Sequence, residues 1–243
     1  MINVIDTHAH LDQINPLSLV LENAKIAGVI SIITVGTNFE SNVKILKIAE
    51  ENQDFVFPSI GIHPWDVESE DRNSLEFIEA NVGKCVAIGE IGLDFWIKKD
   101  KSKQVAVFKH QLEIACKNHK PVLVHSRGAW EDCYKIIKEI EPSKVIFHWY
   151  SGPLHILDQI IESGYSISAT PAAEYSKHLG QAIRHAPLSS ILLETDSPVK
   201  YRGKVSEPAD VIKSLKAVAE LKHTPLEEVA KITTINAEEF FGL

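Results

Sequence analysis

Two histidines near the start of the chain are spaced so that they could share a metal ion. His8 and His10 stand two positions apart in the segment DTHAH. Successive side chains of an extended strand point to opposite faces, so both imidazoles would project from the same face. Two neutral imidazoles that converge supply half of the ligands of a transition-metal site. Taken alone, the pair is weak evidence for a metal site, and a surface pair or a pair satisfied in the core is the favoured interpretation.

Four more potential ligands come from other regions of the chain. Each stands at or just after the end of an apolar, β-branched run: Glu90, His125, His148 and Asp196. Carboxylates and imidazoles that are buried together are costly unless a cation compensates them. We therefore expect a metal centre in which His8 and His10 are joined by these four residues.

The number of candidate ligands points to two ions. Six donors exceed what one tetrahedral ion requires, and two ions that share a carboxylate would use them all. The mixture of imidazoles and carboxylates favours Zn, Mn, Fe or Ni over a site for Mg alone, although Mg stays a candidate beside Zn and Mn. Two divalent ions commonly serve in phosphate-ester hydrolysis. Asp196 is the best candidate for the general base, because its second oxygen could accept a proton from the attacking water. Asp196 and Glu90 are thus the predicted catalytic residues.

Short apolar runs take turns with helical patterns along the chain, and together they predict the strands and helices that position these residues. Most of the runs are apolar without alternation, as strands buried on both faces are. The expected strands are 2–7, 29–35, 55–60, 85–89, 121–124, 144–147, 165–168 and 190–193. The expected helices are 16–27, 38–52, 69–81, 100–119, 129–139, 153–163, 176–185, 208–221 and 225–241.

Eight strand–helix units in 243 residues fit a TIM-like (β/α)8 barrel, which typically needs ~250 residues. A doubly wound open sheet is the alternative, and it is disfavoured because no GxGxxG turn follows the first strand. No linker or low-complexity tract divides the chain, so residues 1–243 are expected to form one domain. A barrel places its active site in the loops at the C-terminal ends of the strands, where the six candidate ligands fall.

Composition narrows the class of protein. Hydrophobic residues make up 44% of the chain and charged residues 24%, which indicates a globular protein and argues against disorder. Three cysteines, at 85, 116 and 133, form no CxxC pair, which indicates a reducing compartment and no zinc finger. No stretch approaches the ~18 apolar residues of a membrane span, and the N-terminus lacks the regions of a signal peptide. We therefore expect a cytoplasmic protein without a membrane partner.

The formal net charge of -8 argues against holding long nucleic acid by charge alone. Basic residues nevertheless follow the same strand ends as the ligands: Lys98, Lys99, Lys101, Lys103, Arg127, Lys200, Arg202 and Lys204. The loop after the third strand is instead acidic, with Asp66, Glu68, Glu70 and Asp71. Such an uneven rim could steer a short phosphodiester end to the metals, although ordinary solvated lysines remain the favoured interpretation of the run 98–103.

Six motifs, taken in order, resemble those of the TatD family of metal-dependent hydrolases, within the amidohydrolase-like superfamily. They are DTHAHLD at 6–12, GIHPW at 61–65, GEIGLDF at 89–95, HSR at 125–127, HWYSG at 148–152 and ETDSP at 194–198. The resemblance covers essentially the whole chain. It implies a TIM-like barrel and a deoxyribonuclease, 3′-directed or endonucleolytic, that uses divalent metal.

The resemblance also implies roles for single residues. One ion would be held by His8, His10, Glu90 and Asp196, and Glu90 would bridge to a second ion held with His125 and His148. His63 and Arg127 match positions near the substrate phosphate. The chain departs from the family pattern in HWYSG, where many members have HCFSG, and at Ser206, where many carry Asn. These departures leave every ligand position intact and bear on substrate choice.

Aromatic residues gather in the same loops: Trp65, Trp96, Trp130, Trp149, Tyr150 and Tyr201. They could stack on bases, or they could pack the loops onto the barrel. We expect Trp149 and Tyr150 to stack and Trp130 to pack. The predicted substrate contacts are His63, Arg127, Trp149, Tyr150 and Arg202. Asp6, Asp94 and Glu194 could orient ligands from outside, and the six histidines outside the site are expected at the surface.

Three functions remain open at this point. The leading one is a metal-dependent phosphodiesterase that acts on DNA, with short or single-stranded ends as its substrate. The second keeps the site but cleaves an amide, a lactone or an aminoacyl ester, because the same activated water can attack carbonyl carbon. The third is a non-catalytic protein that retains the metal, which an open base such as Asp196 disfavours because structural sites are closed.

Overall fold

Strands and helices alternate along the chain in the predicted order. The computed structural model describes residues 2–69 and 72–243, and within them eight strands form a sheet whose order follows the chain. Each neighbouring pair in this sheet is parallel. The strands are β1 (Val4–Ala9), β2 (Val29–Val35), β3 (Val56–Ile60), β4 (Ala87–Gly92), β5 (Val122–His125), β6 (Val145–Phe147), β7 (Ser166–Ala169) and β8 (Ile191–Leu193).

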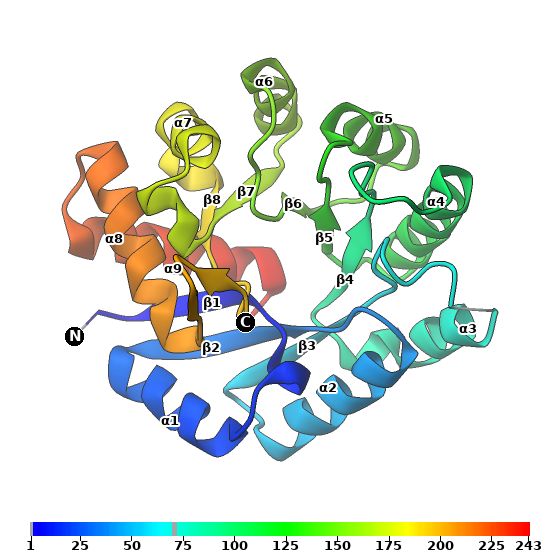
Figure 1. Ribbon diagram of the computed structural model, residues 1–243, viewed down its shortest axis with the longest axis horizontal. Coiled ribbons are helices and arrows are strands. Elements are labelled where there is room, and N and C mark those ends of the chain that lie inside the picture. Colours follow the sequence, from blue (N-terminus) through cyan, green and yellow to red (C-terminus); the bar gives the residue numbers. More distant parts are fainter. Residues whose placement is uncertain (1, 70–71) are drawn as a thin grey trace.

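Helices follow the strands along the chain, and most of them surround the sheet on its outside (Figure 1), while the last two follow β8. The helices are α1 (Leu17–Ala27), α2 (Phe39–Glu51), α3 (Arg72–Asn81), α4 (Lys101–Lys117), α5 (Trp130–Ile140), α6 (Leu154–Glu162), α7 (Lys177–His185), α8 (Val211–Lys222) and α9 (Leu226–Phe241). Glu70 and Asp71, which belong to the predicted acidic loop and to the predicted helix 69–81, lie outside the described residues.

The barrel closes between β1 and the loop that follows β8. Ala9 and Ser197 form a parallel bridge, and the backbone N–H of His10 donates to the Ser197 carbonyl (2.8 Å). The N–H of Asp196 donates to the His8 carbonyl, also at 2.8 Å. The TIM-like barrel is therefore confirmed, and the alternative of an open, doubly wound sheet is wrong. The closure also places two predicted ligand segments, far apart in sequence, side by side.

Alternate residues of the strands supply two separate cores, which is why the strands are apolar without alternation. One core lies between the sheet and the surrounding helices and includes Ile32, Val124 and Phe147. The other is built from the residues that follow or precede these in the strands, among them Ile33 and Leu123.

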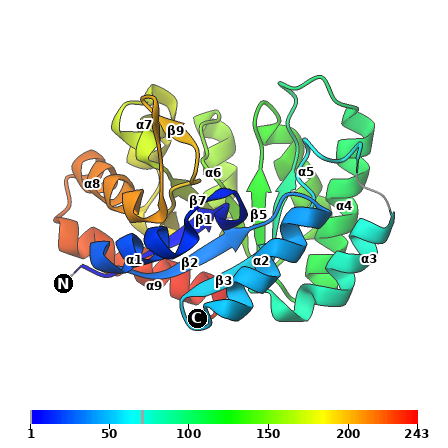
Figure 2. The ribbon, with the colours of Figure 1, turned by 60° about the horizontal axis from the view of Figure 1, so that its bottom comes forward.

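Helix α9 covers the end of the barrel at which the strands begin. Phe240 and Phe241 belong to the same core cluster as Ile33 and Leu123, and the Lys144 ammonium, just before β6, donates to the Phe240 carbonyl (3.2 Å). Both chain ends lie on this side in Figure 2, whereas β5 points to the opposite side. The end of the barrel at which the strands finish is therefore left for polar groups.

A short antiparallel hairpin, β9 (Lys200–Tyr201) with β10 (Lys204–Val205), follows β8. The Tyr201 hydroxyl donates to the Thr195 carbonyl (2.7 Å), which attaches the hairpin to the end of the barrel where the ligands lie. Among the described residues, no helix has both the length and the apolar character that a membrane span requires.

Candidate metal centre

Four predicted ligands bring one donor atom each to a common point at the end of the barrel. His8 Nε2 lies 3.3 Å from Glu90 Oε2 and 3.7 Å from Asp196 Oδ1. His10 Nε2 lies 3.6 Å from Glu90 Oε2 and 3.3 Å from Asp196 Oδ1, and the two Nε2 atoms are 3.4 Å apart. Donors bonded at ~2.1 Å to a tetrahedral ion are ~3.4 Å from one another. The four side chains therefore fit a single cation.

The outer nitrogens of two imidazoles show which nitrogen faces the cluster. His10 Nδ1 lies 2.9 Å from the Val35 carbonyl oxygen, and His148 Nδ1 lies 2.9 Å from Glu194 Oε1. Because both oxygens accept hydrogen bonds, each Nδ1 carries a proton, and in the neutral ring Nε2 turns its lone pair to the carboxylates. Lone pairs that face carboxylate oxygens repel unless a proton or a metal ion lies between them. This arrangement is typical of metal-binding histidines.

The charges of the cluster also favour a cation. Burial alone would raise the pKa of Glu90, but the nearby imidazoles, chiefly that of His63, hold it well below its usual range. Burial would lower the pKa of His10, but the hydrogen bond and the charge of Asp196 outweigh burial and raise that pKa to about 9. Both carboxylates are thus stabilised by positive charge beside them. Protonated imidazoles supply this charge in the absence of metal, and divalent ions that bind here would replace those protons.

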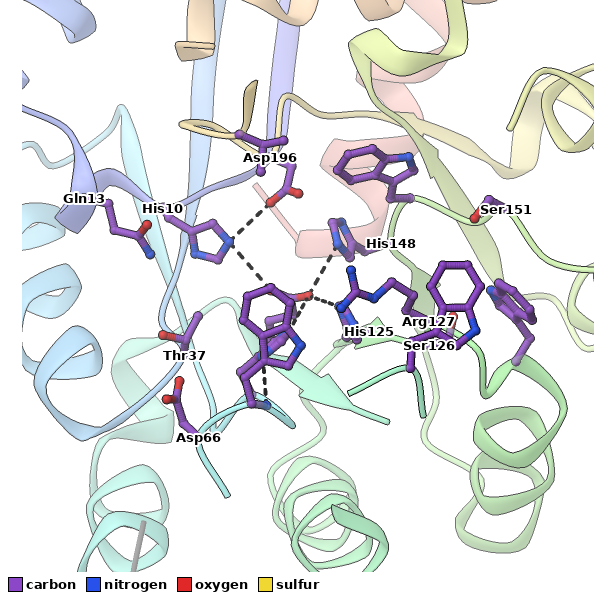
Figure 3. Close-up of a pocket in the computed structure, with 17 residues that line it drawn as sticks. His10, Gln13, Thr37, Asp66, His125, Ser126, Arg127, His148, Ser151 and Asp196 are labelled. Atoms are coloured by element: carbon purple, nitrogen blue, oxygen red, sulfur yellow. Dashed lines mark hydrogen bonds and ion pairs between the residues drawn. The ribbon is translucent and has the colours of Figure 1, made fainter. Parts of the chain in front are cut away.

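The second oxygen of Glu90 faces a second group of imidazoles. Glu90 Oε1 lies 2.7 Å from His125 Nδ1 and 3.4 Å from His148 Nε2, and dashed lines mark these contacts in Figure 3. One carboxylate therefore contacts both groups of predicted ligands. All six predicted ligands are brought together, as a bridging role for Glu90 requires.

Comparison with known proteins agrees with this geometry. A family model described as TatD related DNase matches residues 5–242. The chain belongs to the TatD family. It is 33% identical over 254 residues to an uncharacterized metal-dependent hydrolase, YabD, from Bacillus subtilis, with 99% of each chain covered. It is 32% identical over 260 residues to the human protein named Deoxyribonuclease TATDN3, covering 99% of this chain and 95% of that one.

A crystal structure of a TatD homologue from Escherichia coli, YJJV, superposes on the whole chain with a TM-score of 0.93 at 29% identity, and all of both chains is covered. This TatD protein is a metal-dependent hydrolase, and its clusters of His, Glu and Asp support binding of divalent metal.

His63 also approaches Glu90 in this TatD site, but as a hydrogen-bond donor. His63, Glu90 and His125 form a compact group of potential ligand atoms, and His63 Nε2 lies 3.4 Å from Glu90 Oε1. The backbone N–H of Trp65, however, donates to His63 Nδ1 (3.2 Å), so the proton of the neutral ring is on Nε2. A protonated Nε2 cannot bind a metal, and this favours the predicted role of His63 as a substrate contact.

Asp94 connects the metal centre of the TatD barrel to the loops around it. Its Oδ2 accepts from the Trp65 indole N–H (2.7 Å) and from the Arg127 Nε and Nη2 groups (2.9 and 2.8 Å), and lies 3.1 Å from His125 Nε2. Burial would raise the pKa of Asp94, but the bonds from His125, Trp65 and Arg127 hold it well below its usual range. The predicted contact with a ligand histidine is confirmed, whereas the links to Trp65 and Arg127 were not predicted.

We expect Asp94→Asn to weaken metal binding and turnover in this TatD protein by about 10–100-fold, the usual effect of losing a partner behind a ligand. An amide accepts fewer of the donors that Asp94 satisfies, so His125 loses its fixed orientation. Metal titration and steady-state kinetics measure both quantities. Asp158→Asn, at an exposed carboxylate that pairs with His185, is the matched control. Unchanged metal affinity and turnover would show that Asp94 does not orient the ligand.

Glu194 and Asp6, the other two acidic residues near the TatD ligands, have different hydrogen-bond partners. Glu194 contacts His148, as the prediction allowed. Asp6 is fully buried, but it accepts from the backbone N–H and the hydroxyl of Thr195 (2.8 and 2.6 Å), so it holds the loop after β8. The six remaining histidines are exposed, as predicted: His110, His119, His155, His178, His185 and His223.

A pocket of about 670 Å³ opens beside the TatD metal centre. Its lining includes the predicted contacts His63, Arg127 and Trp149. Gln13 and Thr37, which were not singled out from the sequence, also line it, and the signal that could have found them is their place in the segments that follow the first two predicted strands, Thr37 two residues and Gln13 six residues after the predicted strand end. Figure 3 shows the Gln13, Thr37 and Arg127 side chains among those that line the pocket.

Two predicted substrate contacts of the TatD chain, Tyr150 and Arg202, do not line the pocket. The prediction that Tyr150 stacks on a base is wrong, because its ring is 0% exposed in the core and its hydroxyl donates to the Pro153 carbonyl (2.7 Å). Arg202 is exposed on the hairpin, over the Tyr175 ring and 3.7 Å from Glu174, and is not part of the pocket lining. The Lys99 ammonium pairs with Glu68 (2.9 Å), which favours the interpretation of the run 98–103 as a solvated surface.

Proposed function

We propose that this metal-dependent hydrolase is a deoxyribonuclease, a 3′-directed exonuclease or an endonuclease, that cleaves phosphodiester bonds of DNA with short or single-stranded ends. The observation that carries the proposal is the Glu90 carboxylate, whose two oxygens each face a separate group of ligands beside the pocket. Two divalent ions in such an arrangement would lower the pKa of water and neutralise charge on the attacked phosphate. The name of the human relative and the description of the family model support DNA as the substrate.

We propose that Asp196 accepts the proton of the attacking water. Its Oδ1 faces His8 and His10, so Oδ2 is left for a proton, and the residue lines the pocket. Its backbone has a φ of 52°, a conformation that is uncommon for a residue with a side chain and is held by the hydrogen bond to the His8 carbonyl. We propose that His63 donates from Nε2–H to an oxygen of the phosphate, which its protonation on Nε2 and its position in the pocket lining support.

The same residues could direct water to a carbonyl carbon, so the nature of the bond has to be tested directly. Purified protein should be assayed with single-stranded DNA, RNA, aminoacyl esters, amides and lactones under the same metal conditions. We expect cleavage of DNA from free 3′ ends or within the strand. Cleavage of carbonyl substrates without any cleavage of nucleic acid would contradict the deoxyribonuclease and favour the amide, lactone or aminoacyl-ester hydrolase.

Removal of metal should abolish turnover. EDTA is expected to stop DNA cleavage completely, and excess Mn²⁺ or Mg²⁺ should restore it, because the imidazoles and carboxylates alone do not activate water sufficiently at neutral pH. Elemental analysis of the native protein should find two ions per chain, with Zn, Mn and Mg as the candidates. Cleavage that persists after the metal has been removed, as measured in the same samples, would refute a metal-dependent mechanism.

We propose a cytoplasmic location as well. The support is that the three cysteines are free thiols, two of them buried, as expected of a protein from a reducing compartment.

A further inference from the structure

All four tryptophans of the chain line the pocket beside the metal centre. They follow β3, β4, β5 and β6, three of them in loops and Trp130 as the first residue of α5, so the convergence is a property of the barrel and is not due to proximity in sequence. The tryptophans are Trp65, Trp96, Trp130 and Trp149. Packing of loops does not require them all to face the same opening, and two remain substantially exposed, Trp65 at 48% and Trp96 at 68%.

Arg127 lies between two of these rings and is held there. Its guanidinium carbon is 5.2 Å from the centre of the Trp65 ring and 5.8 Å from that of Trp96. Asp94 occupies its Nε and Nη2 groups. A bidentate grip on phosphate needs two free N–H groups on one edge, and Asp94 takes the edge that offers Nε and Nη2. The edge that carries Nη1 stays able to donate, and the face of the guanidinium, beside two indole rings, adds a flat cationic surface to the side of the pocket.

Two glycines allow the tryptophan rings to lie close to the loops. A β-carbon at Gly128 would come within 2.3 Å of the Trp96 ring, and one at Gly152 within 2.6 Å of the Trp130 ring. The two rings meet edge to face with their centroids 6.1 Å apart. Trp65, Arg127, Trp96 and Trp130 thus form a continuous surface of planar groups, which we call the aromatic wall.

Trp149 stands next to the ligand His148 and is held in a fixed position. Its backbone has a φ of 43°, and its N–H donates to Ser168 Oγ (2.9 Å) and Glu194 Oε1 (3.1 Å). Its ring contacts Tyr201 of the hairpin, with 5.6 Å between centroids. The aromatic wall and Trp149 therefore line the same pocket as Glu90 and Asp196.

We infer that this pocket holds one unpaired nucleobase of the substrate strand, stacked on the aromatic wall, while the adjacent phosphate reaches the metal centre. The inference rests on the proposed function. Indole and guanidinium planes stack on the face of any base. The pocket would therefore prefer an unpaired, unstacked base and would discriminate little between the four bases.

The chain reports on this pocket without an added label, because every tryptophan lines it. We would titrate the metal-loaded protein with deoxyadenosine 5′-monophosphate and, separately, with 2-deoxyribose 5-phosphate, and follow tryptophan fluorescence. Neither compound contains a phosphodiester bond that could be cleaved. We expect the nucleotide to quench fluorescence and to bind more tightly by on the order of tenfold. Equal affinity and equal quenching by the two compounds would overturn the inference.

Two variants of Trp96 would test whether the aromatic wall causes the preference for the nucleotide. Trp96→Ala should lower the affinity for the nucleotide toward that for the sugar phosphate, and should raise KM for single-stranded DNA with little change in kcat, as loss of uniform binding does. Trp96→Phe should retain most of the preference. Phe39→Ala, at a 40% exposed ring that is not part of the pocket lining, is the control and should behave as the wild type. Circular dichroism would verify that Trp96→Ala is folded. If the folded variant still prefers the nucleotide to the sugar phosphate, the aromatic wall does not stack the base.

The outcomes separate this inference from the function on which it rests. If DNA is cleaved but both small ligands bind equally, the deoxyribonuclease stands and the base pocket is refuted. If the nucleotide is preferred but no DNA is cleaved, base binding is supported and the proposed activity fails. If neither preference nor cleavage is found, both are refuted.

Discussion

Replacing Glu90 with glutamine should abolish hydrolysis and metal binding together. Glu90 Oε2 faces the His8 and His10 side of the site, and Oε1 faces His125 and His148. Glutamine keeps the shape but lacks the negative charge, and its NH2 group would point a donor at one of the two groups. Losing a partner behind a ligand costs about 10–100-fold, so the loss of a shared ligand should exceed that factor.

Elemental analysis and single-turnover cleavage would measure the two effects in the same preparation. Glu79→Gln, at an exposed carboxylate paired with Lys117, is the matched control and should keep normal metal content. Thermal unfolding would show whether the Glu90→Gln barrel remains folded. A folded variant with two ions per chain and normal turnover would contradict the bridging role.

Replacing Asp196 with asparagine should separate catalysis from metal binding. Three other donors, from His8, His10 and Glu90, remain around the first ion position, so most of the metal should be retained. The amide cannot accept the proton of the attacking water, and loss of a positioned general base typically lowers kcat by about 10²–10⁴-fold. KM should change little, because the pocket lining is otherwise intact.

The decisive measurements are kcat and metal content of the same Asp196→Asn sample. Asp132→Asn, at an exposed residue in the first turn of α5, is the control for the chemical change alone. If the metal is lost together with turnover, Asp196 acts as a ligand only. If kcat is unchanged, another group accepts the proton.

The order of elements and the ligand set could be predicted from the chain because both depend on local patterns. Each predicted strand overlaps an observed one, and the ends differ by three residues at most, as for 85–89 against Ala87–Gly92. Apolar runs buried on both faces indicate parallel strands, and a parallel barrel brings all strand ends to one side. His8 and His10 converge because a strand has a period of two.

The surroundings of the ligands could not be predicted in the same way. Tyr150 follows Trp149 directly, yet one ring lines the pocket and the other lies in the core. Arg127 has the sequence position of a phosphate contact, but Asp94, 33 residues away, occupies two of its N–H groups. Both outcomes depend on how loops from different strands pack against one another.

By itself, then, the sequence determined the barrel, the side of the barrel that carries the site and the six residues that could hold metal. Hydrophobic periodicity indicates which face of an element is buried, and closure of a parallel barrel brings all C-terminal strand ends, with the ligands that follow them, to one side. Only the tertiary structure decided that Glu90 faces both groups of ligands, that Asp94 holds His125 and Arg127 together, and that four tryptophans share one pocket. These contacts join residues on separate loops, and their partners are set by side-chain packing between elements, which no local pattern records.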